Sequence, residues 1–210
     1  MEWILQLPVL FFSVIFHEFA HGFAAYRRGD DTAYLSGRLS FNPLPHIDPV
    51  GTLLLPAACA LMHFRMIGWA KPVPVNPYRL RRPRADMAMV ALSGPLSNIF
   101  LAIVAAIAFR ILSFGFIGAD LQVTLLKTLG FAVVINLLLA VFNMIPVFPL
   151  DGSQVALGFL KGRALEIYEK HIPYGTYIII GLVFSGLLQS LMRPLLNLSL
   201  LVMSPIMGPL

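Results

Sequence analysis

The sequence predicts an all-α polytopic membrane protein, with a core of three transmembrane helices, a re-entrant or hairpin segment and short β-strands in its loops. Hydrophobic residues make up 58% of the 210 residues. Charged residues make up only 12%, whereas soluble domains carry about 25%. The mean hydropathy is +0.82. We expect one domain over 1–210, with its core over about 3–160 and C-terminal apolar segments over 174–210.

The first apolar segment runs from Trp3 to Tyr26. As a helix it would be about 35 Å long, enough to cross a bilayer with some tilt. Its flank is acidic at Glu2, and no small-residue cleavage site follows it. We therefore expect a retained span rather than a cleaved signal peptide.

Later apolar segments predict further spans over 86–113, 128–145 and 174–190. The segment 50–67 is apolar but interrupted by Pro56, and the tail 191–210 carries Pro194 and Pro205. We leave open whether this tail spans, re-enters or lies in the interface.

Polar, turn-rich stretches separate these segments over 27–48 and 68–83. Within them, Gly37–Asn42 alternates weakly and is expected to form a short strand. Lys71–Val75 is expected to be extended, because a residue that precedes a proline is disfavoured in the helical region. Residues 151–173 are expected to form a charged, amphipathic connection.

Two histidines and a glutamate stand inside the first span, in the pattern His17-Glu18-Phe19-Ala20-His21. Histidines four residues apart share one helix face, so both can reach a single metal ion. The glutamate beside them is placed to take a proton from water. A central charged residue costs about 2.5–3.5 kcal/mol to insert into a membrane, so a metal site is favoured over a merely polar helix face.

A zinc ion needs a third protein ligand and an open position for water. The best candidate is Asp151, which follows the 128–145 span in the sequence Asn143-Met-Ile-Pro-Val-Phe-Pro-Leu-Asp151-Gly152. The prolines break the helix there, and Gly152 permits a tight turn. The alternative is that Asp151 only caps the following helix.

The combination of HExxH in one span with NxxPxxPLDG after a later one resembles the site-2 protease family of intramembrane zinc metalloproteases. Both motifs match in full, and Gly94-Pro-Leu-Ser-Asn98 is similar to a third motif of that family. The resemblance covers about residues 10–160. It suggests a minimal member with no room for PDZ or CBS domains.

The resemblance implies roles for individual residues. His17, His21 and Asp151 would hold Zn²⁺, and Glu18 would be the general base. Asn143 would act beside it in catalysis, by holding the substrate backbone or the oxyanion. We expect two further residues to contact substrate, namely Asn98 and His46, although a turn-stabilising role for His46 is also open.

The resemblance also implies regulated intramembrane proteolysis, with a membrane-spanning protein as substrate and the lipid bilayer as surroundings. A regulatory membrane protein is left open. Nucleic acid is excluded as a partner, because the basic residues form no aromatic-interleaved patch. Two competing interpretations remain: a catalytically silent metal-binding scaffold or transporter, and a CAAX-type membrane protease, which would share only the HExxH motif.

A parity argument predicts the topology. The histidines lie toward the C-terminal end of the first span, and Asp151 follows the C-terminal end of 128–145, so an even number of crossings must separate them. The segment 50–67 is therefore expected to be re-entrant. Twelve of the 15 Lys and Arg residues then share one side, which predicts an N-terminus outside and an active site toward the cytoplasm. The expected location is the prokaryotic cell (inner) membrane.

Overall fold

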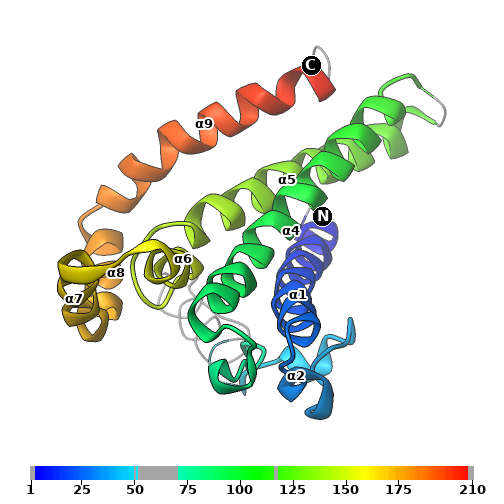
Figure 1. Ribbon diagram of the computed structural model, residues 1–210. Coiled ribbons are helices and arrows are strands. Elements are labelled where there is room, and N and C mark those ends of the chain that lie inside the picture. Colours follow the sequence, from blue (N-terminus) through cyan, green and yellow to red (C-terminus); the bar gives the residue numbers. More distant parts are fainter. Residues whose placement is uncertain (1–2, 50, 52–70, 116–117, 208–210) are drawn as a thin grey trace.

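The computed structural model describes residues 3–49, 51, 71–115 and 118–207, and these are almost entirely helical (Figure 1). Four of the described helices are long and apolar enough to cross a membrane. They are α1 (Trp3–Arg27), α4 (Pro83–Leu112), α5 (Ala119–Asn143) and α9 (Leu187–Met207). This confirms the prediction of an all-α membrane protein.

Shorter helices connect these four. They are α2 (Thr32–Leu35), η1 (Leu44–His46), η3 (Pro77–Arg79), α6 (Asp151–Phe159), α7 (Gly162–His171), η4 (Ile172–Tyr174) and α8 (Gly175–Phe184). Of these, α7 is amphipathic, with an apolar face and a charged face, and it has no buried residue. The predicted charged connection over 151–173 is therefore helical, as α6 and α7.

The long helices pack through small side chains. Helix α1 contacts α4 and α5, while α9 also contacts α4 and α5. At the centre, Ala102 and Ala106 of α4 and Val133 of α5 are fully buried. Small residues let helix backbones approach closely, which is how helices associate where lipid supplies no hydrophobic drive. Because Met203 of α9 joins the same cluster, the core extends beyond the three helices that the sequence predicted.

Two residues near the start of α4 favour a helix that begins there. Pro83 occupies the first turn, where a missing N–H costs nothing. Asp86, one turn later, accepts a hydrogen bond from the backbone N–H of the N-cap residue Arg82 at 2.8 Å, so its carboxylate reaches back to the start of the helix as in a capping box. Figure 1 shows α4 running alongside α5 for most of its length.

The predicted span over 174–190 is wrong. The chain there forms the ten-residue helix α8, followed by a turn at Gly186, which has φ +75°. A ten-residue helix is about 15 Å long and too short to cross a bilayer. The fourth long helix is instead α9, which takes in most of the tail and contains Pro194 and Pro205.

The predicted strand over Gly37–Asn42 is also wrong. This piece consists of bends and turns. Gly37 has φ +68°, and the Ser40 hydroxyl and Asn42 carboxamide accept hydrogen bonds from backbone N–H groups two residues later. Such local bonds compete with strand pairing. The predicted re-entrant segment 50–67 lies, apart from residue 51, outside the described residues.

Candidate metal centre

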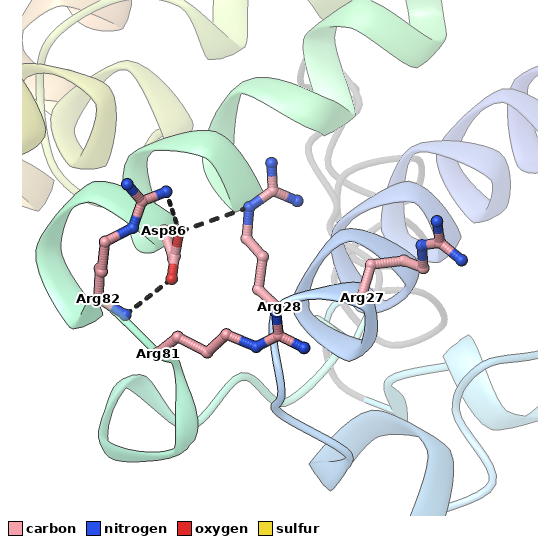
Figure 2. A pocket seen from close by; sticks show the side chains of 5 residues that line it. All are labelled: Arg27, Arg28, Arg81, Arg82 and Asp86. Carbon is pink, nitrogen blue, oxygen red and sulfur yellow. Dashed lines mark hydrogen bonds and ion pairs between the residues drawn. The ribbon is translucent and has the colours of Figure 1, made fainter.

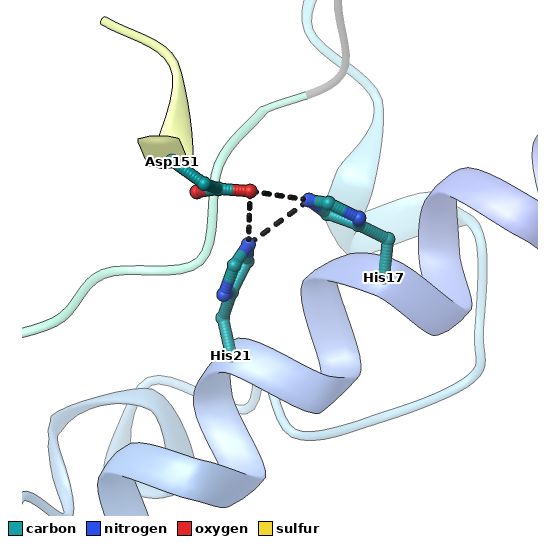
Figure 3. Close-up of side chains that lie close together, drawn as sticks. All are labelled: His17, His21 and Asp151. Atoms are coloured by element: carbon teal, nitrogen blue, oxygen red, sulfur yellow. Dashed lines mark hydrogen bonds and ion pairs between the residues drawn. The ribbon is translucent and has the colours of Figure 1, made fainter. Parts of the chain in front are cut away.

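Side chains from two distant parts of the sequence, α1 and the start of α6, converge on one point (Figure 3). His17 Nε2 lies 2.9 Å from His21 Nε2. Asp151 Oδ2 lies 3.1 Å from the first of these atoms and 3.3 Å from the second. The two imidazoles are buried and their rings are nearly perpendicular, at 87°. The arrangement has the donor atoms and the spacing of a metal centre.

The contacts of the two Nδ1 atoms determine which nitrogen of each imidazole carries the hydrogen. His17 Nδ1 lies 2.6 Å from Asn98 Oδ1, and His21 Nδ1 lies 2.8 Å from the Val90 carbonyl. Both oxygens can only accept, so each Nδ1 carries the hydrogen. In a neutral imidazole the Nε2 atom then presents a lone pair. This is the form that ligates metals, with the remote N–H held by an outer partner.

Three acceptors therefore face one another without a donor among them. Among the residues that the structure describes, the buried Asp151 Oδ2 has no hydrogen-bond partner, although both Nε2 atoms are close. Buried acceptors in such a group are unfavourable unless a cation lies between them. A tetrahedral zinc ion with bonds of about 2.0–2.2 Å separates its ligands by about 3.3 Å. The observed spacing fits that requirement to within a few tenths of an ångström.

Two glycines make room for the cluster. A Cβ on Gly94 of α4 would lie 2.5 Å from His21 Nε2 and 2.6 Å from His17 Cε1. A Cβ on Gly152 would lie 2.3 Å from the Met144 carbonyl oxygen. The first glycine lets the imidazoles pack against α4, and the second lets α6 begin directly against the end of α5.

The turn between α5 and α6 is held from two directions. The Ile145 and Leu150 side chains are buried in a cluster with Met192 of α9. The Tyr168 hydroxyl donates to the Pro146 carbonyl at 2.9 Å. Burial raises the pKa of this hydroxyl above its usual value, so it stays a neutral donor. The turn also contains a cis peptide bond between Phe148 and Pro149.

A buried polar network supports His17 from behind. Asn98 donates from Nδ2 to Asn136 Oδ1 at 2.9 Å, and Asn136 donates to the Ser13 hydroxyl at 2.9 Å. All three side chains are at most 2% exposed. The network therefore joins α1, α4 and α5 and orients the imidazole that Asn98 touches. Its members are satisfied, which is the condition under which buried polar groups stabilise a unique arrangement.

Glu18 lies next to the first histidine and makes one bond across the molecule. Its carboxylate accepts from the Val73 backbone N–H at 2.8 Å. Residues 71–76 have no helical or strand assignment, and Pro72 and Pro74 leave few N–H groups available there. The contact places this irregular stretch beside the α1 segment that carries the histidines.

The remaining predicted site residues lie elsewhere or have a different environment. Asn143 donates to the Leu139 carbonyl one turn earlier in its own helix, at 3.0 Å. Asn98 is fully buried behind His17. His46 is 3% exposed and contacts the Ser40 carbonyl at 3.0 Å, an arrangement that stabilises its own loop. The predicted roles of these three residues in catalysis or substrate binding stay predictions.

Sequence reasoning missed several contributors. Ser13 carries no motif, and the Val90 carbonyl and Val73 N–H are backbone groups that leave no trace in residue type. Two spacings could have indicated the network. Asn136 lies seven residues before Asn143 and so on the same helix face, and Ser13 lies four residues before His17.

Comparison with known proteins identifies relatives. The family model described as "Peptidase family M50" matches residues 106–185. A candidate zinc metalloprotease of Bacillus subtilis, YwhC, is 32% identical over 190 residues, which cover 90% of this chain and 84% of that protein. No solved structure matches the chain.

Two further relatives match a smaller share of their own length than YwhC does. The candidate zinc metalloprotease Rip2 of Mycolicibacterium smegmatis is 30% identical over 89% of this chain and 69% of its own length. The zinc metalloprotease MJ0392 of Methanocaldococcus jannaschii is 24% identical over 77% of this chain and 36% of its own length.

Proposed function

The chain belongs to peptidase family M50, and we propose that it is an intramembrane zinc endopeptidase in which His17, His21 and Asp151 hold the metal. The observation that carries this assignment is the convergence of three buried acceptors, one of them without a hydrogen-bond partner. The names of the relatives support zinc as the metal. We further propose that 1–210 forms a single catalytic domain.

The chain's own residues supply the acid–base chemistry. His17, His21 and Asp151 would hold a zinc ion, which would supply Lewis-acid chemistry for peptide hydrolysis. Glu18, the neighbour of His17, takes a proton from the attacking water and delivers it to the departing amine. Its bond to the Val73 N–H holds the carboxylate in place until then. Asn143 is proposed to contact the substrate backbone or the oxyanion. Its bond to the Leu139 carbonyl uses one N–H of the carboxamide, and the second N–H and Oδ1 can make this contact.

The cluster also supports a topology. His17 and His21 lie toward the C-terminal end of α1, and Asp151 follows α5, so these two helix ends share one side. We propose that this side is the cytoplasm of a prokaryotic cell and that the N-terminus lies outside, because twelve of the 15 Lys and Arg residues would then be cytoplasmic.

The substrate class follows from where the metal lies. We propose that the protein cuts membrane-spanning or membrane-proximal segments of other proteins. A helical peptide bond is shielded by its own turn, so substrates with helix-breaking residues near the cut are expected to be preferred. Equal cleavage of uninterrupted poly-Leu helices would contradict this preference.

A cleavage assay tests the proposal directly. Purified protein in lipid vesicles is incubated with a panel of single-span substrates, and cleavage is compared between the wild type and Glu18→Gln. Removal of a general base is expected to slow cleavage about 10²–10⁴-fold, while the zinc content stays unchanged. Lys127→Gln, on a different part of the molecule, serves as a control with normal activity.

Two results would contradict the assignment. Full activity in Glu18→Gln would exclude this residue as the base. Zinc binding without cleavage of any substrate in the panel by the wild type would instead favour a catalytically silent scaffold.

A further inference from the structure

A second polar site lies away from the metal centre, where α1 ends and α4 begins. A cavity of about 550 Å³ is lined by Arg27, Arg28, Arg81, Arg82 and Asp86. Figure 2 shows Arg28 and Arg82 turned toward Asp86 from different directions. Four cations and one anion therefore share one small space.

The charges in this cavity do not balance. Asp86 is 3% exposed. It lies 3.8 Å from Arg28 Nε and 3.4 Å from an Arg82 guanidinium nitrogen. In the part of the chain that the structure describes, no ion pair involves Arg27 or Arg81. With one carboxylate for four guanidinium groups, the cavity has a formal charge of +3.

Neighbouring arginines show that this excess is local. Arg79 pairs with Asp31, and Arg84 donates to the Leu157 carbonyl at 2.8 Å. These two side chains already have acceptors within the fold. Arg27 and Arg81 have no such ion pair within the described ranges, so their guanidinium groups are candidates to bind an external anion.

The position of the cavity suggests the source of that anion. The candidate spans end at Arg27 in α1 and begin at Pro83 in α4, so the lining residues lie at the boundary between the apolar helices and the polar loops. Arg side chains at such a boundary reach the level of the lipid headgroups. Basic pockets between membrane helices are suited to anionic headgroups.

We propose that this cavity binds the phosphate of an anionic phospholipid headgroup. A guanidinium group presents paired N–H donors that match two phosphate oxygens, and Arg27 and Arg81 supply such donors from two different elements. The cavity's volume suits a single headgroup. A protein partner is less well suited, because the cavity is open to the surroundings and its lining comes from only the end of α1 and the start of α4, a small site rather than an extended surface.

Binding there connects two elements of the metal centre. Helix α1 carries His17 and His21, and α4 carries Asn98 and Gly94, which pack against them. A phosphate held between Arg27 and Arg81 bridges the end of α1 and the segment that leads into α4. An occupied cavity is therefore expected to stabilise the folded chain against heat.

The test uses the full chain in a nonionic detergent, titrated with dioctanoyl phosphatidylglycerol or dioctanoyl phosphatidylcholine at low ionic strength. Binding is measured by native mass spectrometry and by the shift in melting temperature. We expect at least tenfold tighter binding of the anionic lipid. The double variant Arg27→Gln/Arg81→Gln is expected to lose this preference, whereas Arg163→Gln/Arg193→Gln, which removes the same charge outside the cavity, keeps it.

Further measurements distinguish an anionic lipid from other anions as the ligand. Equal affinity for the two lipids, or equal loss in both double variants, would overturn the proposal. Inorganic phosphate or an acidic peptide that competes as well as the anionic lipid would show that a headgroup is not the ligand. Should the cavity double variant fail to fold, Arg81→Gln alone is expected to weaken binding at least threefold. This side chain is exposed and forms no ion pair with a described residue.

Discussion

At the scale of single residues, the hydrogen bonds behind the two histidines decide what the cluster can do. Asn98 Oδ1 and the Val90 carbonyl each hold an Nδ1–H, so both Nε2 lone pairs point toward Asp151. Without these partners either ring could adopt the other tautomer and present a hydrogen to the site. The outer partners are therefore part of the metal centre, although they do not touch the metal position.

Replacing Asn98 with alanine is expected to weaken zinc binding about 10–100-fold, because loss of an outer partner costs a metal site that much. Competition with a zinc chelator on the purified protein measures the affinity. Ser97→Ala, which removes a hydroxyl bonded to Gly94 of the same helix, is the matched control and is expected to bind zinc normally. Unchanged affinity in Asn98→Ala would show that His17 does not depend on this bond.

Replacing Gly94 with alanine is expected to displace both imidazoles, because the new methyl group would lie 2.5 Å from His21 Nε2. The variant should lose most of its zinc while its helix content is retained, since alanine is a better helix former than glycine. Zinc analysis together with circular dichroism checks this. Gly130→Ala, whose added Cβ would lie 3.9 Å from Phe109, an ordinary contact distance, is expected to keep its zinc.

At the scale of elements, the connection from α5 to α6 is the part that brings Asp151 back to α1. Gly152 lies against the Met144 carbonyl, Leu150 is buried beside Met192, and Tyr168 holds Pro146. The carboxylate is thus placed by packing on three sides. Capping of α6 alone does not explain its position, because no side-chain hydrogen bond caps that helix.

Replacing Gly152 with alanine is expected to push α6 away from the end of α5, because the added Cβ would lie 2.3 Å from a backbone oxygen that cannot move independently. Asp151 would move with it, and the zinc content should fall while α1 keeps its structure. The measurement is metal analysis of the purified variant. Gly181→Ala, whose Cβ meets no described residue within 4 Å, provides the comparison. Full zinc occupancy in Gly152→Ala would argue against this account of the turn.

Part of the metal site and of the fold could be predicted from the sequence alone. The spacing of His17 and His21 and the Pro-rich turn before Asp151 identified the ligand candidates, because both patterns depend on residue type. The break between α8 and α9 was missed, because hydropathy is continuous there and only the turn at Gly186 interrupts the helix. The supports from Val90 and Val73 use backbone atoms, which any residue at those positions supplies.

At the scale of the whole molecule, the site requires that the C-terminal ends of α1 and α5 lie on one side of the membrane. The arginine-lined cavity lies at the same end of α1 as the histidines. The loop between α4 and α5 then lies on the opposite side. The account therefore predicts the sidedness of particular surface residues.

Single cysteines in a Cys59→Ser background are expected to report this sidedness. Tyr78→Cys, at a position 94% exposed, should react with a membrane-impermeant thiol reagent only after the cytoplasmic face is opened. Phe114→Cys, at a position 64% exposed near the α4–α5 loop, should react in intact cells. Labelling of both positions from the same face would contradict the topology.

The central claim is that two imidazoles and one carboxylate bind zinc, and X-ray absorption at the zinc edge tests it most directly. The account predicts a nearest shell of nitrogen and oxygen at about 2.0–2.2 Å, with the scattering pattern of two imidazoles, and loss of this spectrum in Asp151→Ala. A sulfur shell at about 2.3 Å, or a spectrum that Asp151→Ala leaves unchanged, would contradict it.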